Sequence, residues 1–154
     1  MAEEKITVLY VDDEENNLFS FKATFRIKYQ VLTAISGDEA LKILAANQVH
    51  IIITDQRMPE MTGVEFLEKV LEGFPDPMRI LLTGYADMAA VVDAVNKGKI
   101  FHYLTKPWNE SELDLAINMA YEKYLEKLRL KELNAKLEVS NDQLEFLLRQ
   151  KLLS

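Results

Sequence analysis

Apolar and polar positions alternate in two different ways along the first 121 residues of the chain. Five short runs of β-branched and other apolar residues predict buried strands, and they lie at residues 6–11, 31–34, 51–53, 79–82 and 100–104. After each run, apolar residues recur every three to four positions, which predicts a helix. The pattern therefore predicts a strand followed by a helix, five times over.

Side chains that can cap a helix support four of the predicted helix starts. Ser36 and Thr62 each precede a glutamate by three residues, which is the spacing of a capping box. Asp87 and Asn109 are placed to cap the fourth and fifth helices. The side chains that we expect to face the core from the helices are Leu18, Phe21, Phe25, Leu41, Leu44, Ala45, Val64, Leu67, Val70, Phe74, Met88, Val91, Val92, Val95, Leu113, Ile117 and Ala120.

A repeated strand–helix unit predicts a parallel sheet with helices on both faces and right-handed crossovers. The expected fold class is α/β, with a doubly wound sheet of five parallel strands. In the order 2-1-3-4-5 of flavodoxin-like sheets, the first and third strands are neighbours. Ligands of such folds bind outside the carboxyl ends of the strands. The residues that follow the strands are therefore the candidates for a functional site.

Three aspartates follow the two strands that would be neighbours. Asp12 and Asp13 follow the first strand, and Asp55 follows the third. Carboxylates this close repel one another, and one or more of their pKa values should rise unless a cation neutralises them. An all-oxygen site with vacant positions suits Mg²⁺ better than zinc or copper. We therefore predict a Mg²⁺ site at this edge of the sheet.

Thr83 and Lys106 follow the fourth and fifth strands at the same edge. A hydroxyl and a fixed cation beside a metal-bound carboxylate can hold a phosphoryl group. Asp55 would then be the nucleophile, while Mg²⁺ and Lys106 neutralise the charge that develops on the transferred oxygens. Taken singly, each residue has a simpler explanation. Asp55 could cap a helix, Lys106 could be a surface lysine, and Thr83 could bond a neighbouring backbone group.

Composition narrows the class of protein. The 154-residue chain has no cysteine, which excludes disulfides, thiolate zinc sites and cysteine nucleophiles. Residues 122–154 carry 7 basic and 6 acidic side chains, which leaves 11 and 19 for residues 1–121. A body with a net charge of −8 is a poor partner for nucleic acid or anionic lipid. Because no apolar run reaches membrane-spanning length and the N-terminus is unlike a signal peptide, we expect a cytoplasmic protein.

Four motifs at the predicted strand ends resemble the receiver domain of two-component response regulators. They are VDD at residues 11–13, TDQRMPEMTG at 54–63, LLTGYAD at 81–87 and YLTKPW at 103–108. The resemblance spans about residues 5–121. Each motif alone is a weak signal, but all four in order are very specific. The wording of DQRMP and TGYAD is similar to that of receivers that precede AAA+ transcription activators or HD-GYP phosphodiesterases.

The resemblance implies a role for each acidic residue. Asp55 matches the phosphoacceptor, which takes a phosphoryl group from a sensor histidine kinase or a phosphotransfer protein. Asp12 and Asp13 match the acid pair that organises Mg²⁺, and Asp13 is the usual direct ligand. Arg57 stands where the family lends a backbone carbonyl to the metal. Such a domain is not an enzyme in the ordinary sense, because it catalyses only its own phosphoryl transfer and slow dephosphorylation.

The resemblance also implies a switch. Thr83 matches the switch hydroxyl that moves toward the phosphoryl oxygens, and Lys106 matches the lysine that pairs with the phosphoryl group. The peptide bond before Pro107 is typically cis in the family. Tyr103 matches the switch aromatic that swings inward on activation, although a static core residue is the simpler alternative. The family's usual output face is formed by the fourth helix, the fifth strand and the fifth helix.

Two positions, Arg57 and Gly84, qualify the resemblance. Arg57 is long and basic where many members have a shorter residue, and in the family this side chain influences how long the aspartyl phosphate survives. Gly84 stands where alanine is common, which could loosen the loop on which the switch depends. Trp108 is expected to pack as a surface or interface aromatic with no chemical role.

The end of the chain predicts a second structural unit. Residues 109–154 contain no proline and no glycine, so the last helix is expected to run past the domain into a helical segment at residues 122–154. Ser140 occupies a d position of a later a/d register that contains Leu130, Leu133, Leu137, Leu144 and Leu147. This register does not continue that of the preceding turns, which predicts a break near residues 128–130. Ser140 is also a possible cap at which a helix restarts.

The apolar stripe predicts a parallel coiled-coil homodimer through the C-terminal helix. Two alternatives remain. The helix could pack back on its own domain, or the stripe could await a domain that is absent from this chain. No effector domain is visible, which is expected of the front part of a longer protein.

Two other functions share part of the pattern. A phosphatase of the haloacid dehalogenase type uses an Asp nucleophile but requires a second acid two residues later, where Arg57 stands. A pseudo-receiver that serves as a dimerisation cap usually lacks one of the acids or the lysine, and none is missing here. We therefore interpret the chain as a phosphorylation-controlled switch, in which phosphoryl transfer to Asp55 shifts a two-state equilibrium at Thr83 and Tyr103.

Overall fold

Five parallel strands form a single sheet in the order β2-β1-β3-β4-β5. The computed structural model describes residues 5–153, apart from the side chain of Tyr85. The strands are β1 Thr7–Val11, β2 Gln30–Ala34, β3 Ile51–Asp55, β4 Met78–Thr83 and β5 His102–Thr105. Their bounds differ by one or two residues from those predicted, and the doubly wound α/β fold is confirmed.

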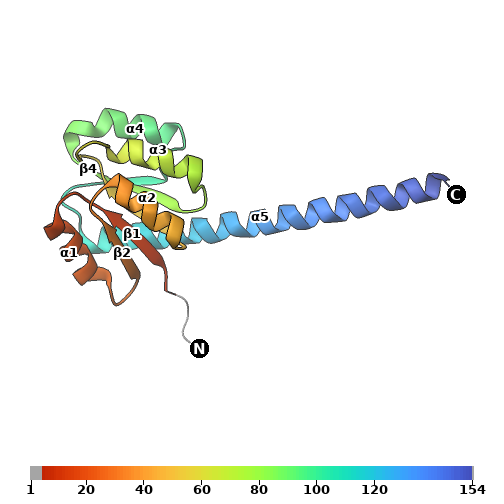
Figure 1. The fold of residues 1–154 in the computed structure, drawn as a ribbon, viewed down its shortest axis with the longest axis horizontal. Coiled ribbons are helices and arrows are strands. Elements are labelled where there is room, and N and C mark those ends of the chain that lie inside the picture. Colours follow the sequence, from red (N-terminus) through yellow and green to blue (C-terminus); the bar gives the residue numbers. More distant parts are fainter. Residues whose placement is uncertain (1–4, 154) are drawn as a thin grey trace.

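Helices cover both faces of the sheet (Figure 1). They are α1 Glu15–Phe25, α2 Gly37–Ala46, α3 Gly63–Gly73, α4 Met88–Asn96 and α5 Glu110–Leu153, and a 3₁₀ turn at Tyr85–Asp87 precedes α4. One core cluster contains the buried side chains of α1 and α5, and the other contains those of α2, α3 and α4. The sheet is therefore buried on both sides.

The central strand β3 is apolar without a break because both of its faces are buried. Ile51 and Ile53 belong to the cluster under α1 and α5, while Ile52 belongs to the cluster under α2, α3 and α4. All three side chains are fully buried. Because successive residues of a strand point to opposite faces, a strand covered on both faces needs an apolar side chain at every position.

Three of the four predicted helix caps are present. Thr62 and Glu65 form a complete capping box, Ser36 accepts a hydrogen bond from the Glu39 backbone N–H, and the Asn109 carboxamide oxygen accepts one from the Ser111 N–H. The cap predicted at Asp87 is wrong, because this side chain makes no capping hydrogen bond. Its carboxylate pairs with Arg57 instead.

Two side chains that were predicted to face the core are exposed. In α2 the buried stripe runs through Ala40 and Leu44, so Ala45 lies one position too far round the helix. In α4 the buried stripe runs through Val91 and Ala94, and Val92 is exposed. Consecutive residues of a helix are separated by about 100° around its axis, so a shift of one position moves a side chain off the buried face.

Helix α5 contains 44 residues without interruption, which corresponds to a length of about 66 Å. The break predicted near residues 128–130 and the restart predicted at Ser140 are therefore wrong. A change of apolar register alters which side chains share a face, but it leaves the backbone hydrogen bonds unchanged, and no proline or glycine interrupts them.

The part of α5 beyond Tyr124 leaves the body and projects away from it (Figure 1). Tyr124 is the last residue of α5 in the core, and it lies three positions past the predicted end of the domain. The Lys131 ammonium still reaches the Asp76 carboxylate at 3.5 Å. Residues 132–153 are exposed, which rules out the alternative that this segment packs back on its own domain.

Candidate functional site

The carboxyl ends of β1 and β3 bring three aspartates together. The two strands are neighbours, and Val11 lies opposite Thr54 in their register. The residues that follow this pair are therefore adjacent across the sheet edge. Carboxylate oxygens of Asp12, Asp13 and Asp55 lie within 4.8 Å of one another. The cluster predicted from the sequence is thus present in the structure.

Asp12 is fully buried and its carboxylate is held by three donors. Its Oδ2 atom accepts hydrogen bonds from the Tyr10 hydroxyl at 3.2 Å and from the Asn17 carboxamide at 3.1 Å. Its Oδ1 atom accepts one from the Glu14 backbone N–H at 3.0 Å. Three donors to one buried carboxylate fix its orientation. Asp13, by contrast, is half-buried and faces a more open surrounding.

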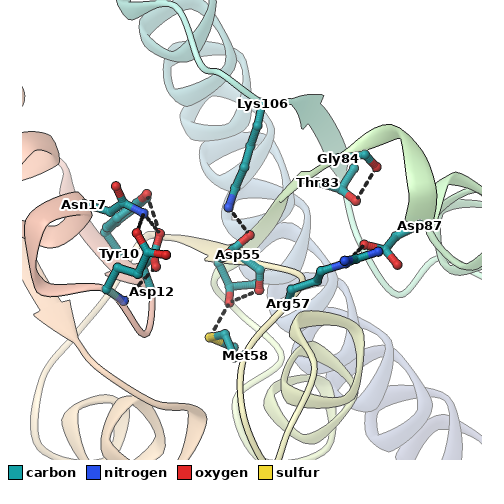
Figure 2. A network of polar contacts seen from close by, with 12 residues as sticks. Tyr10, Asp12, Asn17, Asp55, Arg57, Met58, Thr83, Gly84, Asp87 and Lys106 are labelled. Atoms are coloured by element: carbon teal, nitrogen blue, oxygen red, sulfur yellow. Dashed lines mark hydrogen bonds and ion pairs between the residues drawn. The ribbon is translucent and has the colours of Figure 1, made fainter.

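Asp55 is 5% exposed and lies against a lysine (Figure 2). The Lys106 Nζ atom is 2.5 Å from Asp55 Oδ1. Burial is the largest effect on Asp55 and raises its pKa above the ordinary value, and the charge of Asp12 adds to the rise. The hydrogen bond and the charge of Lys106 act in the opposite direction. The carboxylate therefore lacks the solvation of an exposed acid, and a cation beside it compensates in part.

The loop behind Asp55 is fixed by its own backbone. The Gly63 N–H donates to the Gln56 carbonyl, and the Val64 N–H donates to the Gln56 side-chain oxygen, both at 2.9 Å. A β-carbon at Gly63 would lie 2.4 Å from the Asp55 carbonyl oxygen. The loop can close this tightly only because residue 63 is glycine. Asp55 is consequently held at a rigid corner between β3 and α3.

The donor set of the cluster fits a hard divalent cation. Three carboxylates supply oxygen atoms only, and the described residues add no histidine to the group. Oxygen ligands of this kind suit Mg²⁺ or Mn²⁺. The Arg57 side chain points away from the cluster, and its Nε atom pairs with Asp87 Oδ2 at 3.0 Å (Figure 2). Arg57 therefore leaves the mouth of the site to the acids and the lysine.

Thr83 and Tyr103 lie on the adjoining strands. Thr83 is fully buried at the end of β4, and its hydroxyl donates to the Gly84 carbonyl at 3.1 Å. The simpler explanation, a bond to a neighbouring backbone group, is thus realised in this structure. Tyr103 on β5 is half-buried and packs against the cluster under α2, α3 and α4. The Lys106 N–H donates to the Thr83 carbonyl at 2.9 Å, which ties the two strand ends together.

Two residues of this site were missed in the sequence. Tyr10 and Asn17 both donate to Asp12, yet each was absent from the predicted set. The signal for Tyr10 was available, because residues two apart on a strand share a face. Trp108, which was predicted to pack as a surface or interface aromatic, is half-buried and packs against the cluster under α1 and α5. The Lys106–Pro107 peptide bond is cis, as predicted.

The sequence matches one family over most of its length. The family described as response regulator receiver domain matches residues 8–118. The chain is 39% identical over 122 residues to the hydrogenase transcriptional regulatory protein HoxA of Cupriavidus necator, over 79% of this chain and 25% of HoxA. It is 30% identical over 134 residues to the regulatory protein AtoC of Escherichia coli, over 86% of this chain and 29% of AtoC. The chain thus spans about a quarter of the length of the curated relatives that it matches.

Solved structures of similar fold and sequence are also found. The crystal structure of adenylate cyclase from Rhodopirellula baltica matches with a TM-score of 0.83 and 33% identity, over 86% of this chain and 98% of that chain. The signal receiver domain of an HD domain-containing protein from Pseudomonas fluorescens matches with a TM-score of 0.77 and 31% identity, over 84% and 96%. Separately, no helix within residues 5–153 is both long and apolar enough to cross a membrane.

Proposed function

The chain belongs to the response regulator receiver domains, and we propose on this basis that it is a phosphorylation-controlled switch with Asp55 as its phosphoacceptor. The phosphoryl donor would be the phosphohistidine of a sensor histidine kinase or of a phosphotransfer protein. The chain would not turn over other substrates. It would catalyse only its own phosphorylation and a slow return to the free acid.

The ion pair between Lys106 and Asp55 carries this proposal. The ammonium contacts a buried carboxylate, and two further carboxylates lie within 4.8 Å. An ion pair on its own could be explained as a contact that stabilises the fold. Two additional acids next to the pair repel its carboxylate, so fold stability does not explain their presence. Acids that repel one another at a strand end, with a lysine on one side, are suited to a cation and a phosphoryl group.

In the proposed transfer, a carboxylate oxygen of Asp55 is the nucleophile and an imidazole nitrogen of the donor is the leaving group. An Asp55 carboxylate oxygen attacks phosphorus, and the bond from phosphorus to the donor imidazole nitrogen breaks as the new P–O bond forms. The electron pair of that bond stays on the imidazole nitrogen, which takes a proton from solvent. Lys106 exchanges its contact with Asp55 for a phosphoryl oxygen and thereby stabilises the charge on the transferred group.

Mg²⁺ fits the cluster as a cofactor. Asp12, Asp13 and Asp55, together with the backbone carbonyl of Arg57, would hold it. It would supply charge neutralisation at the phosphoryl oxygens. Asp13 is the more open acid and can approach the ion directly, while Asp12 offers a carboxylate whose orientation is fixed by three donors.

The switch would start at Thr83. We propose that its hydroxyl leaves the Gly84 carbonyl for a phosphoryl oxygen and that Tyr103 then moves further into the body. The change would be read at the face formed by α4, β5 and α5. Because a phosphoryl oxygen accepts more strongly than a carbonyl, the exchange favours the phosphorylated arrangement.

One experiment tests the phosphoacceptor. The full chain is incubated with Mg²⁺ and acetyl phosphate, and its intact mass is measured. We expect one alkali-labile phosphoryl group in the wild type, none in Asp55→Asn, and labelling about tenfold slower in Lys106→Gln. Lys97→Gln, which removes an exposed lysine paired with Asp93, is the matched control and should label normally. Continuous hydrolysis of phosphate esters would instead identify a phosphatase, and no labelling would identify a dimerisation cap.

The far part of α5 would join two copies of the chain. Residues 132–153 are exposed, and Leu133, Leu137, Leu144 and Leu147 are each about half exposed or more at coiled-coil spacing. We propose that they pair in a parallel homodimer. Sedimentation at tens of micromolar, where coils of this length associate, should give a dimer. The double variant Leu133→Asp/Leu137→Asp should give a monomer, and Lys136→Glu should not. A monomeric wild type would contradict the dimer.

The output is proposed to lie beyond the receiver. HoxA is named as a transcriptional regulator and is about four times as long as the matched region. We propose that the coil passes the phosphorylation signal to an effector, and that this chain does not itself bind nucleic acid, since its body is acidic. The coding sequence after Ser154 tests this, because an output domain encoded there would support it and an immediate stop codon would contradict it.

A further inference from the structure

Tyr10 is a buried polar residue that the proposed phosphoryl transfer does not use. Its side chain is 1% exposed, and its ring stacks on Phe21 with the centroids 4.2 Å apart and the planes 3° from parallel. The hydroxyl at the end of the ring reaches Asp12 Oδ2 at 3.2 Å (Figure 2). The stack fixes the ring, so the direction of the hydroxyl is fixed as well.

The Tyr10 hydroxyl is the donor in this contact. A carboxylate oxygen accepts and a phenol hydroxyl donates, so the proton of the hydrogen bond comes from Tyr10. Tyr10 and Asn17 together therefore supply both hydrogen bonds to one oxygen of Asp12.

The same ring belongs to an aromatic cluster that ends beside the Lys106 loop. Phe21 and Phe25 lie 6.1 Å and 5.8 Å from the ring of Trp108. Trp108 follows Lys106 by two residues. A side chain that sets the position of Asp12 is thus packed in one cluster with the only tryptophan of the chain, whose emission can report on the site.

We propose that Tyr10 is a positioning residue for the divalent-cation site, in which its hydroxyl holds the Asp12 carboxylate in the orientation that binds the ion. This inference rests on the proposed function. A tyrosine that merely filled the core would need only its ring, and phenylalanine would serve as well. A positioning tyrosine needs its hydroxyl, because donors behind a metal-binding carboxylate fix its orientation and tune its affinity.

The test is a titration of the full chain with Mg²⁺ alone, followed by Trp108 emission, and a parallel titration with Mn²⁺ in which the free ion is counted by electron paramagnetic resonance. Tyr10→Phe keeps the stacked ring and removes the hydroxyl. We expect about tenfold weaker binding of either ion. Labelling by acetyl phosphate should be slow at low Mg²⁺ and return to the wild-type rate at saturating Mg²⁺.

Tyr29→Phe is the matched control. It also removes a tyrosine hydroxyl that donates to an aspartate, in this case Asp114 on α5, and it lies at the edge where β2 begins. We expect ion affinity within twofold of the wild type in this variant. Should Tyr10→Phe not fold, Asn17→Ala removes the second donor to the same oxygen from a half-buried helix position and should weaken binding in the same direction.

Three outcomes would overturn the inference. Ion affinity of a folded Tyr10→Phe within twofold of the wild type would show that the residue only fills the core. An unchanged affinity in Asn17→Ala would do so where Tyr10→Phe cannot be measured. A wild-type chain that binds neither ion and takes no phosphoryl group would overturn the proposed function as well, which separates that failure from the other two.

Discussion

The two halves of α5 are one continuous helix held in different ways. In residues 110–124 the helix buries Leu113, Ala116, Ile117, Ala120 and Tyr124 against the sheet. In residues 125–153 the described leucines and other large apolar side chains are exposed within the chain. Both halves have a helical backbone, but only the first buries side chains against the body. The second reaches the body through the exposed ion pair of Lys131 with Asp76.

The comparison shows that secondary structure and domain membership are separate properties. Most helical stability in proteins comes from packing of an apolar face, so we expect the far half to need a partner, whereas the near half has one in the body. The near half of α5 belongs to the body that carries the candidate site. Under the proposed function, the far half would carry a change outward, because its apolar stripe is exposed within the chain.

The largest difference in the free energy of unfolding is expected between Leu113→Ala and Leu137→Ala. Leu113 is fully buried, so its truncation should lower the free energy of unfolding by about 3 kcal/mol. Leu137 is 59% exposed, so its truncation should cost less than about 0.5 kcal/mol when association does not contribute. Urea unfolding at the lowest workable protein concentration measures both values. Equal losses would contradict the division of the helix.

Tyr124→Ala and Leu125→Ala locate the boundary between the halves. Tyr124 is 8% exposed and belongs to the core, so its truncation should lower the free energy of unfolding by about 2 kcal/mol. Leu125, the next residue, is 38% exposed and should cost less than about 1 kcal/mol. Urea unfolding of the two variants under identical conditions provides the measurement. A larger loss for Leu125 would place its side chain in a contact that the fold does not show.

Asp55→Asn should stabilise the body at neutral pH in the absence of a divalent cation. The pKa of Asp55 is raised in the folded state, mainly by burial, so its ionisation costs folding free energy. That cost is absent below the unfolded pKa of about 4 and develops as the pH rises through the folded pKa. The gain in melting temperature should therefore be small near pH 3.5 and larger at pH 7.

Two controls make the pH experiment specific. Asp76→Asn changes an exposed aspartate that pairs with Lys131 at 3.5 Å, and it should show no comparable gain between the two pH values. Added Mg²⁺ should raise the melting temperature of the wild type and leave Asp55→Asn nearly unchanged, because ligand binding stabilises only the form that binds it. A variant less stable than the wild type at pH 7 would show that the Lys106 contact outweighs burial.

The Arg57–Asp87 pair should give the smallest effect. It joins the loops after β3 and β4, and its side chains are 73% and 24% exposed. A double-mutant cycle with Arg57→Gln and Asp87→Asn should give a coupling energy of about 0.5 kcal/mol. The same variants should change the lifetime of the phosphorylated chain more than its stability. A coupling energy above about 2 kcal/mol would make this pair a structural contact of the body.

Most of the fold and the clustering of Asp12, Asp13 and Asp55 followed from the sequence, because parallel strands and the acids at their ends are encoded locally. The run Ile51–Ile53 predicts a doubly covered strand, and strand order then brings Asp12 to Asp55. The missed features depend on contacts distant in the sequence. Asp87 does not cap α4 because its carboxylate pairs with Arg57, 30 residues away. Sequence periodicity alone cannot show such a pair. The hydrogen bond of Tyr10 to Asp12 was missed because a buried aromatic is usually interpreted as core packing alone.

The most direct test is to locate the phosphoryl group. After the full chain has reacted with acetyl phosphate and Mg²⁺, borohydride reduction converts an aspartyl phosphate to homoserine, and peptide mass mapping identifies the altered residue. We predict homoserine at Asp55 in the wild type and at no other aspartate. Homoserine at Asp12 or Asp13 with Asp55 intact, or no altered aspartate in a folded chain, would contradict the assignment of Asp55 as the phosphoacceptor.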